Sequence, residues 1–233
     1  MNKEIFIEEL KKLNITPTIK QLEQLEKYYE LLVTENKKYN LTAITDKEAV
    51  YLKHFFDSLT ITKIIELNNQ SLCDIGTGAG FPGIVLKIFF PNLNMTLVDS
   101  TLKKCKFLNY VIEELKLTNI EVLNKRAEEF SKEVREEFDI VTSRAVAPLK
   151  HLLEYSIPLV KVDGSYIAMK SDITNEIIGI SNYEKKLDIK KINTIEFILP
   201  IEHSLRTLIL YKKLKTTSLM YPRKYNEIKK KDL

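Results

Sequence analysis

Apolar residues in the first part of the chain recur at the three- and four-residue spacing of an amphipathic helix. The clearest stretches span residues 22–32 and 50–59, and they predict two or three helices before about residue 67. Thr16-Pro17 predicts the start of one helix, and Thr45-Asp46 offers an N-cap for another. The N-terminal part is therefore expected to be helical.

From residue 71 the pattern changes to short β-rich runs that alternate with helical segments. Strands are predicted over residues 72–75, 95–98, 121–123, 139–142, 165–170, 192–199 and 207–212. Helical segments between the first five strands are predicted to begin near Pro82, Leu102, Ala127 and Leu149. Strand and helix in repetition imply right-handed crossovers and a parallel sheet, with the last two strands as a hairpin at one edge. The expected fold is a doubly wound α/β domain over residues 68–233 behind a helical cap over residues 1–67, as one continuous globular unit.

Length and composition fit a single globular protein. The 233 residues are 44% hydrophobic and 29% charged, enough for one sizeable core. No run approaches the roughly 20 apolar residues of a membrane span, and no signal-peptide core follows the first charges, so a cytoplasmic protein is expected. Cys73 and Cys105 form neither a disulfide framework nor a metal-ligand cluster, so no metal site is expected. The Lys-rich tail over residues 221–233 is expected to be loosely held.

Four of the six glycines lie within one short segment, at Gly76, Gly78, Gly80 and Gly83. Glycine is needed where the backbone turns sharply or a ligand approaches it closely. The segment follows a predicted strand and precedes the predicted helix start at Pro82, so it lies at the carboxyl end of the first strand, where such sheets bind ligands. The loop is predicted to hold a cofactor.

The residues leave two ligands open for this loop. Gly78-x-Gly80-x-x-Gly83 satisfies the dinucleotide fingerprint, and Asp99 lies about 20 residues further on, where it can take ribose hydroxyls. Asp74, just before the loop, would repel a pyrophosphate but suits the ammonium of S-adenosylmethionine. S-adenosylmethionine is therefore favoured over a dinucleotide, and a structural turn without a ligand is the least favoured interpretation.

Seven segments occur in the order, and at about the spacing, of one known family. They are Asn40-Leu-Thr-Ala-Ile44, His54-Phe-Phe-Asp-Ser-Leu59, Asp74-Ile-Gly-Thr-Gly-Ala-Gly-Phe-Pro-Gly83, Val98-Asp-Ser100, Arg126-Ala-Glu-Glu129, Ser143-Arg-Ala145 and Tyr221-Pro-Arg-Lys224. The chain thereby resembles the bacterial small-subunit ribosomal RNA methyltransferase G family, also called glucose-inhibited division protein B. The resemblance implies a class I (Rossmann-like) methyltransferase with a mostly parallel seven-stranded sheet. It also implies methyl transfer from S-adenosylmethionine to N7 of a guanine in small-subunit ribosomal RNA.

The resemblance also implies roles for individual residues. Asp74, Gly76, Gly78, Gly80 and Phe81 would belong to the cofactor loop. Asp99 would lie near the ribose, Ala127 and Glu128 beside the adenine, and Arg144 against the cofactor or the base. The substrate would be positioned by Asn40, His54 and Asp57. The expected RNA contacts are Arg126, Lys170, Arg223 and Lys224. The tail departs from the family, because Asn226-Glu-Ile228 stands where the family usually has Gly-x-Pro.

The residue inventory agrees with this chemistry. Guanine N7 carries a lone pair and no proton, so orientation rather than a general base is required. Methyltransferases that act on exocyclic amines usually show Asn-Pro-Pro-aromatic after the fourth strand, where this chain has Thr142-Ser-Arg-Ala-Val-Ala-Pro148. Neither cysteine follows a proline, as a nucleophile for pyrimidine C5 would. A guanidinium such as that of Arg144 suits guanine, because its planar fork of donors matches base acceptors.

The expected partner is small-subunit ribosomal RNA or the 30S subunit, bound by a monomer. The net charge of +4 favours a polyanion only slightly, and lysines around the cleft would contact phosphates without reading sequence. Two other functions stay open at this point: a ribosome-assembly factor without turnover on the same fold, and a methyltransferase of small molecules. These residues also have structural interpretations: Arg126 and Arg144 as ion pairs with Glu128 or Asp99, and His54 as a packed core residue paired with Asp57 at helical spacing.

Overall fold

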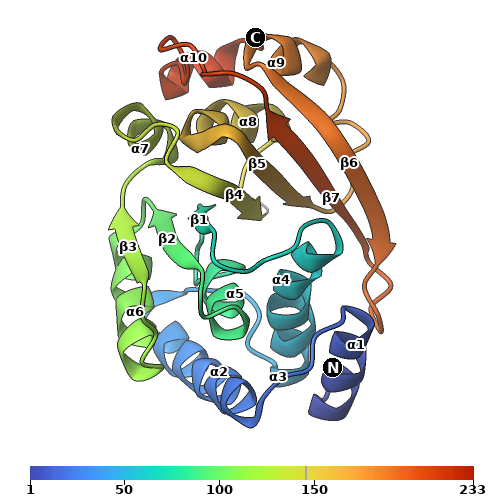
Figure 1. Cartoon of the computed structure of the whole chain (residues 1–233). Coiled ribbons are helices and arrows are strands. Elements are labelled where there is room, and N and C mark those ends of the chain that lie inside the picture. The colour runs from blue at the N-terminus through green and yellow to red at the C-terminus, as the bar shows by residue number, and fades with distance from the viewer. Residues whose placement is uncertain (145) are drawn as a thin grey trace.

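The computed structural model describes residues 1–144 and 146–233, and its centre is a seven-stranded sheet (Figure 1). The strands follow the order β3-β2-β1-β4-β5-β7-β6. Their bounds are β1 (Ser71–Ile75), β2 (Asn94–Asp99), β3 (Ile120–Asn124), β4 (Phe138–Arg144), β5 (Val160–Lys170), β6 (Ile189–Ile198) and β7 (Leu205–Lys213). The first five strands pair in parallel. Strands β6 and β7 form the antiparallel edge hairpin, with β7 against β5, so the predicted α/β topology is confirmed.

Helices cover both faces of the sheet because each strand sends alternate side chains to opposite sides. In β1, Leu72 belongs to one core cluster and Cys73 to the other. The first cluster is covered by α5 (Gly83–Phe89), α6 (Leu102–Glu114) and the N-terminal helices, and the second by α7 (Ala127–Glu133), α8 (Leu149–Ser156) and α9 (Ile180–Lys186). Within the described residues, no helix is both long and apolar enough to cross a membrane.

The N-terminal part contains α1 (Lys3–Lys12), α2 (Ile19–Tyr39) and a third helical run made of four short pieces. This run joins α3 (Lys47–Val50), a π-helical turn (Tyr51–Phe56), α4 (Asp57–Leu59) and a 3-10 turn (Thr60–Lys63). Apolar side chains of α1 and α2 share one core with α5, α6 and the sheet. The helical cap and the α/β part are therefore packed as one body.

The capping residues show how local sequence sets the helix starts. Asp46 caps α3 as expected, accepting from the Ala49 N–H at 2.9 Å. The expected start at Pro17 is wrong by two residues, because Thr18 forms a capping box with Gln21. Helix α2 therefore begins at Ile19.

The tail is not loosely held, contrary to the expectation from its lysines. It forms α10 (Tyr225–Lys230), and its Tyr221 and Ile228 are buried. Arg223 makes a bidentate ion pair with the carboxylate of Glu154, whose side chain is completely buried. These anchors fix the tail against α8.

Candidate functional site

The glycine loop joins β1 to α5 at the carboxyl edge of the sheet, and main-chain bonds tie it to β2. The Gly76 and Thr77 N–H groups both donate to the Val98 carbonyl oxygen, at 2.8 and 3.1 Å. The Gly78 N–H donates to Oδ2 of Asp99 at 3.0 Å. Asp99 also accepts from the Thr101 N–H at 2.8 Å, so its carboxylate organises the loop from the end of the second strand.

The glycines of the loop serve two purposes. Gly78 has a φ of +64°, and a Cβ there would touch only the Gly76 carbonyl oxygen, at 3.9 Å, so a ligand can reach the main chain. Gly80 has a φ of +101°, but a Cβ there would meet the Tyr28 hydroxyl at 2.5 Å and Ile84 at 2.6 Å. The described contacts give Gly80 a packing role against α2, and its expected part in cofactor binding stays a prediction.

This difference predicts unequal effects of alanine at two glycines with left-handed backbone. We expect Gly80→Ala to lower the free energy of unfolding by roughly 1 to 3 kcal/mol more than Gly78→Ala, because only Gly80→Ala overpacks a filled space. Chemical denaturation of both variants measures the difference. Equal losses would show that backbone strain alone determines the cost.

Asp74 lies beneath the loop and not against a cavity. It is completely buried, its Oδ2 accepts from the Gly83 N–H at 2.9 Å, and among the described residues its Oδ1 has no hydrogen-bond partner. Burial raises the pKa of the Asp74 carboxyl to about 6. Its visible role is to hold the first turn of α5, and its expected contact with a cofactor ammonium stays a prediction.

Beside the loop is a cavity of about 640 Å³ along the ends of β1, β2 and β4. Five residues expected at the cofactor line it: Gly76, Asp99, Ala127, Glu128 and Arg144. Other side chains of its wall come from α8 and α10, among them His151, Tyr155 and Tyr225. We call this the larger cavity.

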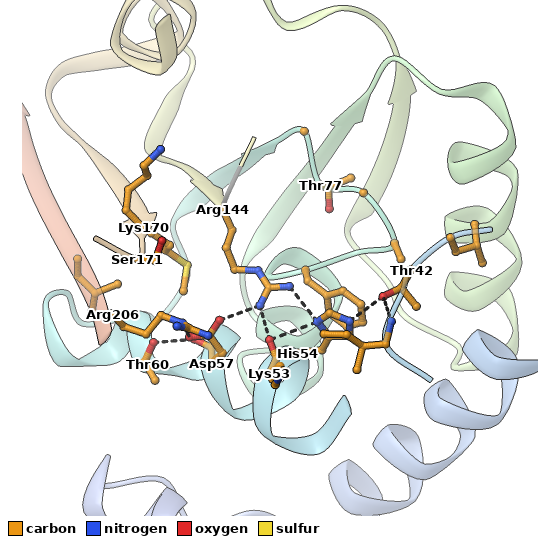
Figure 2. A pocket seen from close by; sticks show the side chains of 18 residues that line it. Thr42, Lys53, His54, Asp57, Thr60, Thr77, Arg144, Lys170, Ser171 and Arg206 are labelled. Atoms are coloured by element: carbon orange, nitrogen blue, oxygen red, sulfur yellow. Dashed lines mark hydrogen bonds and ion pairs between the residues drawn. The ribbon is translucent and has the colours of Figure 1, made fainter. Parts of the chain in front are cut away.

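A second cavity of about 420 Å³, the smaller cavity, lies on the other side of the loop between the helical cap and the sheet (Figure 2). Gly76 and Arg144 line both cavities, so the two spaces meet there. The side chains around the smaller cavity that carry or can accept charge are Lys53, His54, Asp57, Arg144, Lys170 and Arg206. The wall thus has four cations and one carboxylate, with His54 besides.

Arg144, the last residue of β4, is the centre of this smaller cavity (Figure 2). Its Nη1 donates to the Lys53 carbonyl oxygen at 2.7 Å and to Oδ2 of Asp57 at 3.0 Å. Its guanidinium lies 5.4 Å from the centroid of the Phe81 ring. Asp57 accepts from Arg206 Nε as well, at 3.0 Å. One buried carboxylate therefore fixes two arginines, and Arg144 pairs with Asp57 rather than with Asp99.

The π-helical turn explains why a main-chain carbonyl is available to Arg144. In an α-helix the Lys53 carbonyl would accept from the Asp57 N–H. Here that N–H bonds to the carbonyls of His54 and Leu52 instead. The Lys53 carbonyl is freed and accepts from Arg144, in keeping with the frequent placement of π turns at functional sites.

His54 is held between four groups, none of which is Asp57. Its ring stacks on Phe81 with centroids 4.3 Å apart. Its Nδ1 lies 3.3 Å from Arg144 Nη2, which can only donate, and 3.2 Å from the Lys53 carbonyl oxygen, which can only accept, while its Nε2 lies 3.0 Å from Oγ1 of Thr42. Burial, reinforced by the Arg144 charge, lowers the pKa of His54 to about 3. His54 is therefore neutral and weakly basic at neutral pH.

The lowered pKa predicts a dependence of stability on pH. Because His54 takes a proton in the unfolded chain near pH 6.5 but in the folded protein only near pH 3, stability falls as the pH falls through this window. Relative to His54→Gln, the native protein should lose roughly 2 kcal/mol between pH 6.5 and 5, at ~1.4 kcal/mol per pH unit.

Urea denaturation of both proteins at the two pH values measures this loss. Asp74 acts in the opposite direction, because a raised pKa makes its ionisation unfavourable in the folded state, but it is present in both proteins and cancels. The same stability difference at both pH values would contradict the prediction.

Several other expected site residues lie elsewhere or have partners. Asn40 is exposed and ends α2 with a left-handed φ of 50°, and its part in substrate positioning stays a prediction. Lys170 lines the smaller cavity, but its ammonium pairs with Glu176 at 2.8 Å. Arg223 is bound to buried Glu154 and so anchors the tail, and its expected RNA contact stays a prediction. Lys224 remains exposed.

Arg126 lies at the rim of the larger cavity, with its guanidinium 3.9 Å from the Glu128 carboxylate. Sequence reasoning missed Arg206 and Tyr225 altogether. An arginine at the start of the second strand of the hairpin was the only signal for Arg206, and nothing local distinguishes Tyr225. Among the described residues no group of three or more His, Cys, Asp or Glu side chains could hold a metal ion.

The fold is shared with known methyltransferases. The structure of M. jannaschii TYW2 in complex with AdoMet matches with a TM-score of 0.56 and 13% identity, over 74% of this chain and 80% of that one. A SAM dependent methyltransferase from Aquifex aeolicus matches with a TM-score of 0.54 and 14% identity, over 76% and 97%. At this identity the likeness establishes the fold, which is that of class I methyltransferases.

Sequence similarity to curated proteins is much closer. The chain is 48% identical over 208 residues to ribosomal RNA small subunit methyltransferase G of Mycoplasma capricolum, covering 89% of each. It is 48% identical over 230 residues to the protein of that name from Bacillus thuringiensis, covering 96% of this chain and 95% of the relative. Residues 21–203 match the family model described as rRNA small subunit methyltransferase G. The chain therefore belongs to the rRNA small subunit methyltransferase G family.

Proposed function

We propose that this protein transfers the methyl group of S-adenosylmethionine to N7 of a guanine in small-subunit ribosomal RNA. The observation that supports this most directly is the meeting of two different cavities at Gly76 and Arg144. One is bounded by Gly76 and the acidic strand end at Asp99, and the other by the rest of the glycine loop and by cationic side chains. A methyl donor and an RNA base placed in them would face one another across the shared wall.

The larger cavity fits S-adenosylmethionine by the chemistry of its wall. Gly76 brings the start of the glycine loop to this wall, Asp99 offers a carboxylate to ribose hydroxyls, and Ala127 and Glu128 would border the adenine. When bound, S-adenosylmethionine supplies a methyl group on a positively charged sulfur. The loop residues, held to β2 by the Val98 and Asp99 contacts, would fix where that methyl points.

The acceptor side needs orientation more than proton transfer. Guanine N7 has an available lone pair, and His54, with its lowered pKa, is a poor proton acceptor. Arg144 is the side chain best placed to orient the base, because its guanidinium is fixed by Lys53 and Asp57 next to the loop. Such orientation can supply about 7 to 11 kcal/mol of the barrier.

The smaller cavity is suited to a polyanion. Its wall has the four cations Lys53, Arg144, Lys170 and Arg206 against Asp57, and two of them, Lys53 and Lys170, also pair with Glu202 and Glu176. Side chains of this kind position phosphates without reading sequence, and binding should weaken steeply with salt. Sequence discrimination would then depend on the folded 30S particle, on which we expect the protein to act in the cytoplasm as a monomer.

Mapping of N7-methylguanine in ribosomal RNA, by chemical cleavage or reverse transcription, tests the proposal. Cells that lack the gene should lose the methyl group at one small-subunit guanine and regain it on complementation. Unchanged modification at every ribosomal guanine would refute the RNA substrate. Binding to 30S subunits without methyl transfer would instead identify an assembly factor.

A further inference from the structure

The C-terminal helix α10 forms part of the wall of the larger cavity, through Tyr225. From this geometry we infer that Tyr225 is a cofactor-binding residue that closes the adenine end of the site. This inference rests on the proposed placement of S-adenosylmethionine in the larger cavity. It assigns a ligand contact to a part of the chain that lies outside the α/β core, 142 residues after the glycine loop ends at Gly83.

Tyr225 is held at the cavity by anchors on both sides of it. Two residues before it, Arg223 binds Glu154 through its Nε at 2.8 Å, its Nη2 at 2.7 Å and its main-chain N–H at 2.9 Å. Three residues after it, Ile228 is 1% exposed. Because the chain is anchored on both sides of Tyr225, this residue loses little further conformational entropy when a ligand binds, which favours a binding role.

The neighbours of Tyr225 place it at the adenine end. The Arg126 guanidinium lies 5.9 Å from the centroid of its ring, and Arg126 directly precedes Ala127 and Glu128. Lys229 Nζ lies 4.7 Å from the same centroid. Tyr155 of α8 contributes a second aromatic ring to the cavity. Aromatic rings with a few polar groups are the usual lining of a site for a purine.

A purely structural role for Tyr225 makes a different prediction. If the ring served only to pack α10 on the protein, its removal would lower the melting temperature and leave the affinity for the cofactor unchanged. If the ring contacts the adenine, its removal weakens every ligand that carries adenosine. Affinity and stability therefore separate the two roles.

Calorimetry on the full chain with two probes tests the inference. The probes are S-adenosylmethionine and 5′-methylthioadenosine, which keeps the adenosine but lacks the amino acid end. Tyr225→Ala should weaken both by about tenfold, as expected for loss of an aromatic ring against a base. Tyr225→Phe should retain both affinities, and Asn226→Ala, an exposed change in the same helix, is the matched control.

Asp99→Asn distinguishes failure of this inference from failure of the proposed site. If Asp99→Asn weakens S-adenosylmethionine and Tyr225→Ala does not, the cofactor lies in the larger cavity but Tyr225 takes no part, and the inference is overturned. If Tyr225→Ala weakens S-adenosylmethionine alone, the adenine assignment is overturned. If neither variant changes either affinity, the placement of the cofactor itself is wrong. Melting temperatures verify that each variant is folded.

Discussion

Arg144→Ala should lower methyl transfer to isolated 30S subunits by on the order of 100-fold or more while the protein remains folded. Arg144 lines both cavities together with Gly76, and its guanidinium is fixed by contacts to Lys53, His54 and Asp57. A small displacement of a positioning group costs about 100-fold in rate, and the alanine variant loses the group entirely. Transfer of labelled methyl groups under single-turnover conditions measures the effect.

Two further variants make this result specific. Arg144→Lys keeps the charge but not the planar fork, and should be nearly as inactive as Arg144→Ala. Arg206→Ala removes the other arginine bound to Asp57, which lines only the smaller cavity, so its loss should be smaller, about tenfold. Full activity of Arg144→Lys, or a larger defect in Arg206→Ala, would show that charge in the smaller cavity matters more than the orientation supplied by Arg144.

Among the substitutions proposed for this protein, Arg223→Ala should lower the free energy of unfolding most, by about 3 to 5 kcal/mol. The substitution leaves the Glu154 carboxylate completely buried without its partner, and unpaired buried charge is among the most unfavourable changes in a protein. Denaturation in urea measures the loss at neutral pH. The variant should also bind S-adenosylmethionine more weakly, because Arg223 holds the tail that carries Tyr225.

The double variant Arg223→Met, Glu154→Leu is the control. Replacement of both partners by apolar side chains removes the buried charge, so most of the lost stability should return. A loss below about 1 kcal/mol in Arg223→Ala would mean that the pair behaves like an exposed salt bridge. It would also mean that the tail is held mainly by its apolar contacts.

The sequence by itself determined the order of the secondary structure and the place of the glycine loop. Helical and strand periodicities are local, so the seven strands and the helices between the first five could be located within a few residues, whereas α9 between β5 and β6 was not predicted. Parallel topology then follows from the alternation of strands and helices. The loop lies at the carboxyl end of β1 for the same reason, and Asp99 comes beside it because β2 pairs with β1.

The sequence also suggested the correct neighbourhood for His54, Asp57 and Arg144, but through likeness to a family rather than through spacing. Their actual arrangement differs from the expected one. His54 and Asp57 do not pair with each other: one stacks on Phe81, and the other binds Arg144 and Arg206. Helical spacing says which side chains share a helix face, and the partners on another element decide which bonds form.

Only the tertiary structure decided the features that join distant parts of the chain. Arg206 and Asp57 are 149 residues apart, and Arg223 and Glu154 are 69 apart. No local pattern encodes such a pairing, because it depends on how two faces pack. The freed Lys53 carbonyl and the ordered tail also depend on partners from distant parts of the chain. The π-helical turn is stabilised because Arg144 donates to the Lys53 carbonyl, and the lysine-rich tail is ordered because Arg223 binds the buried Glu154.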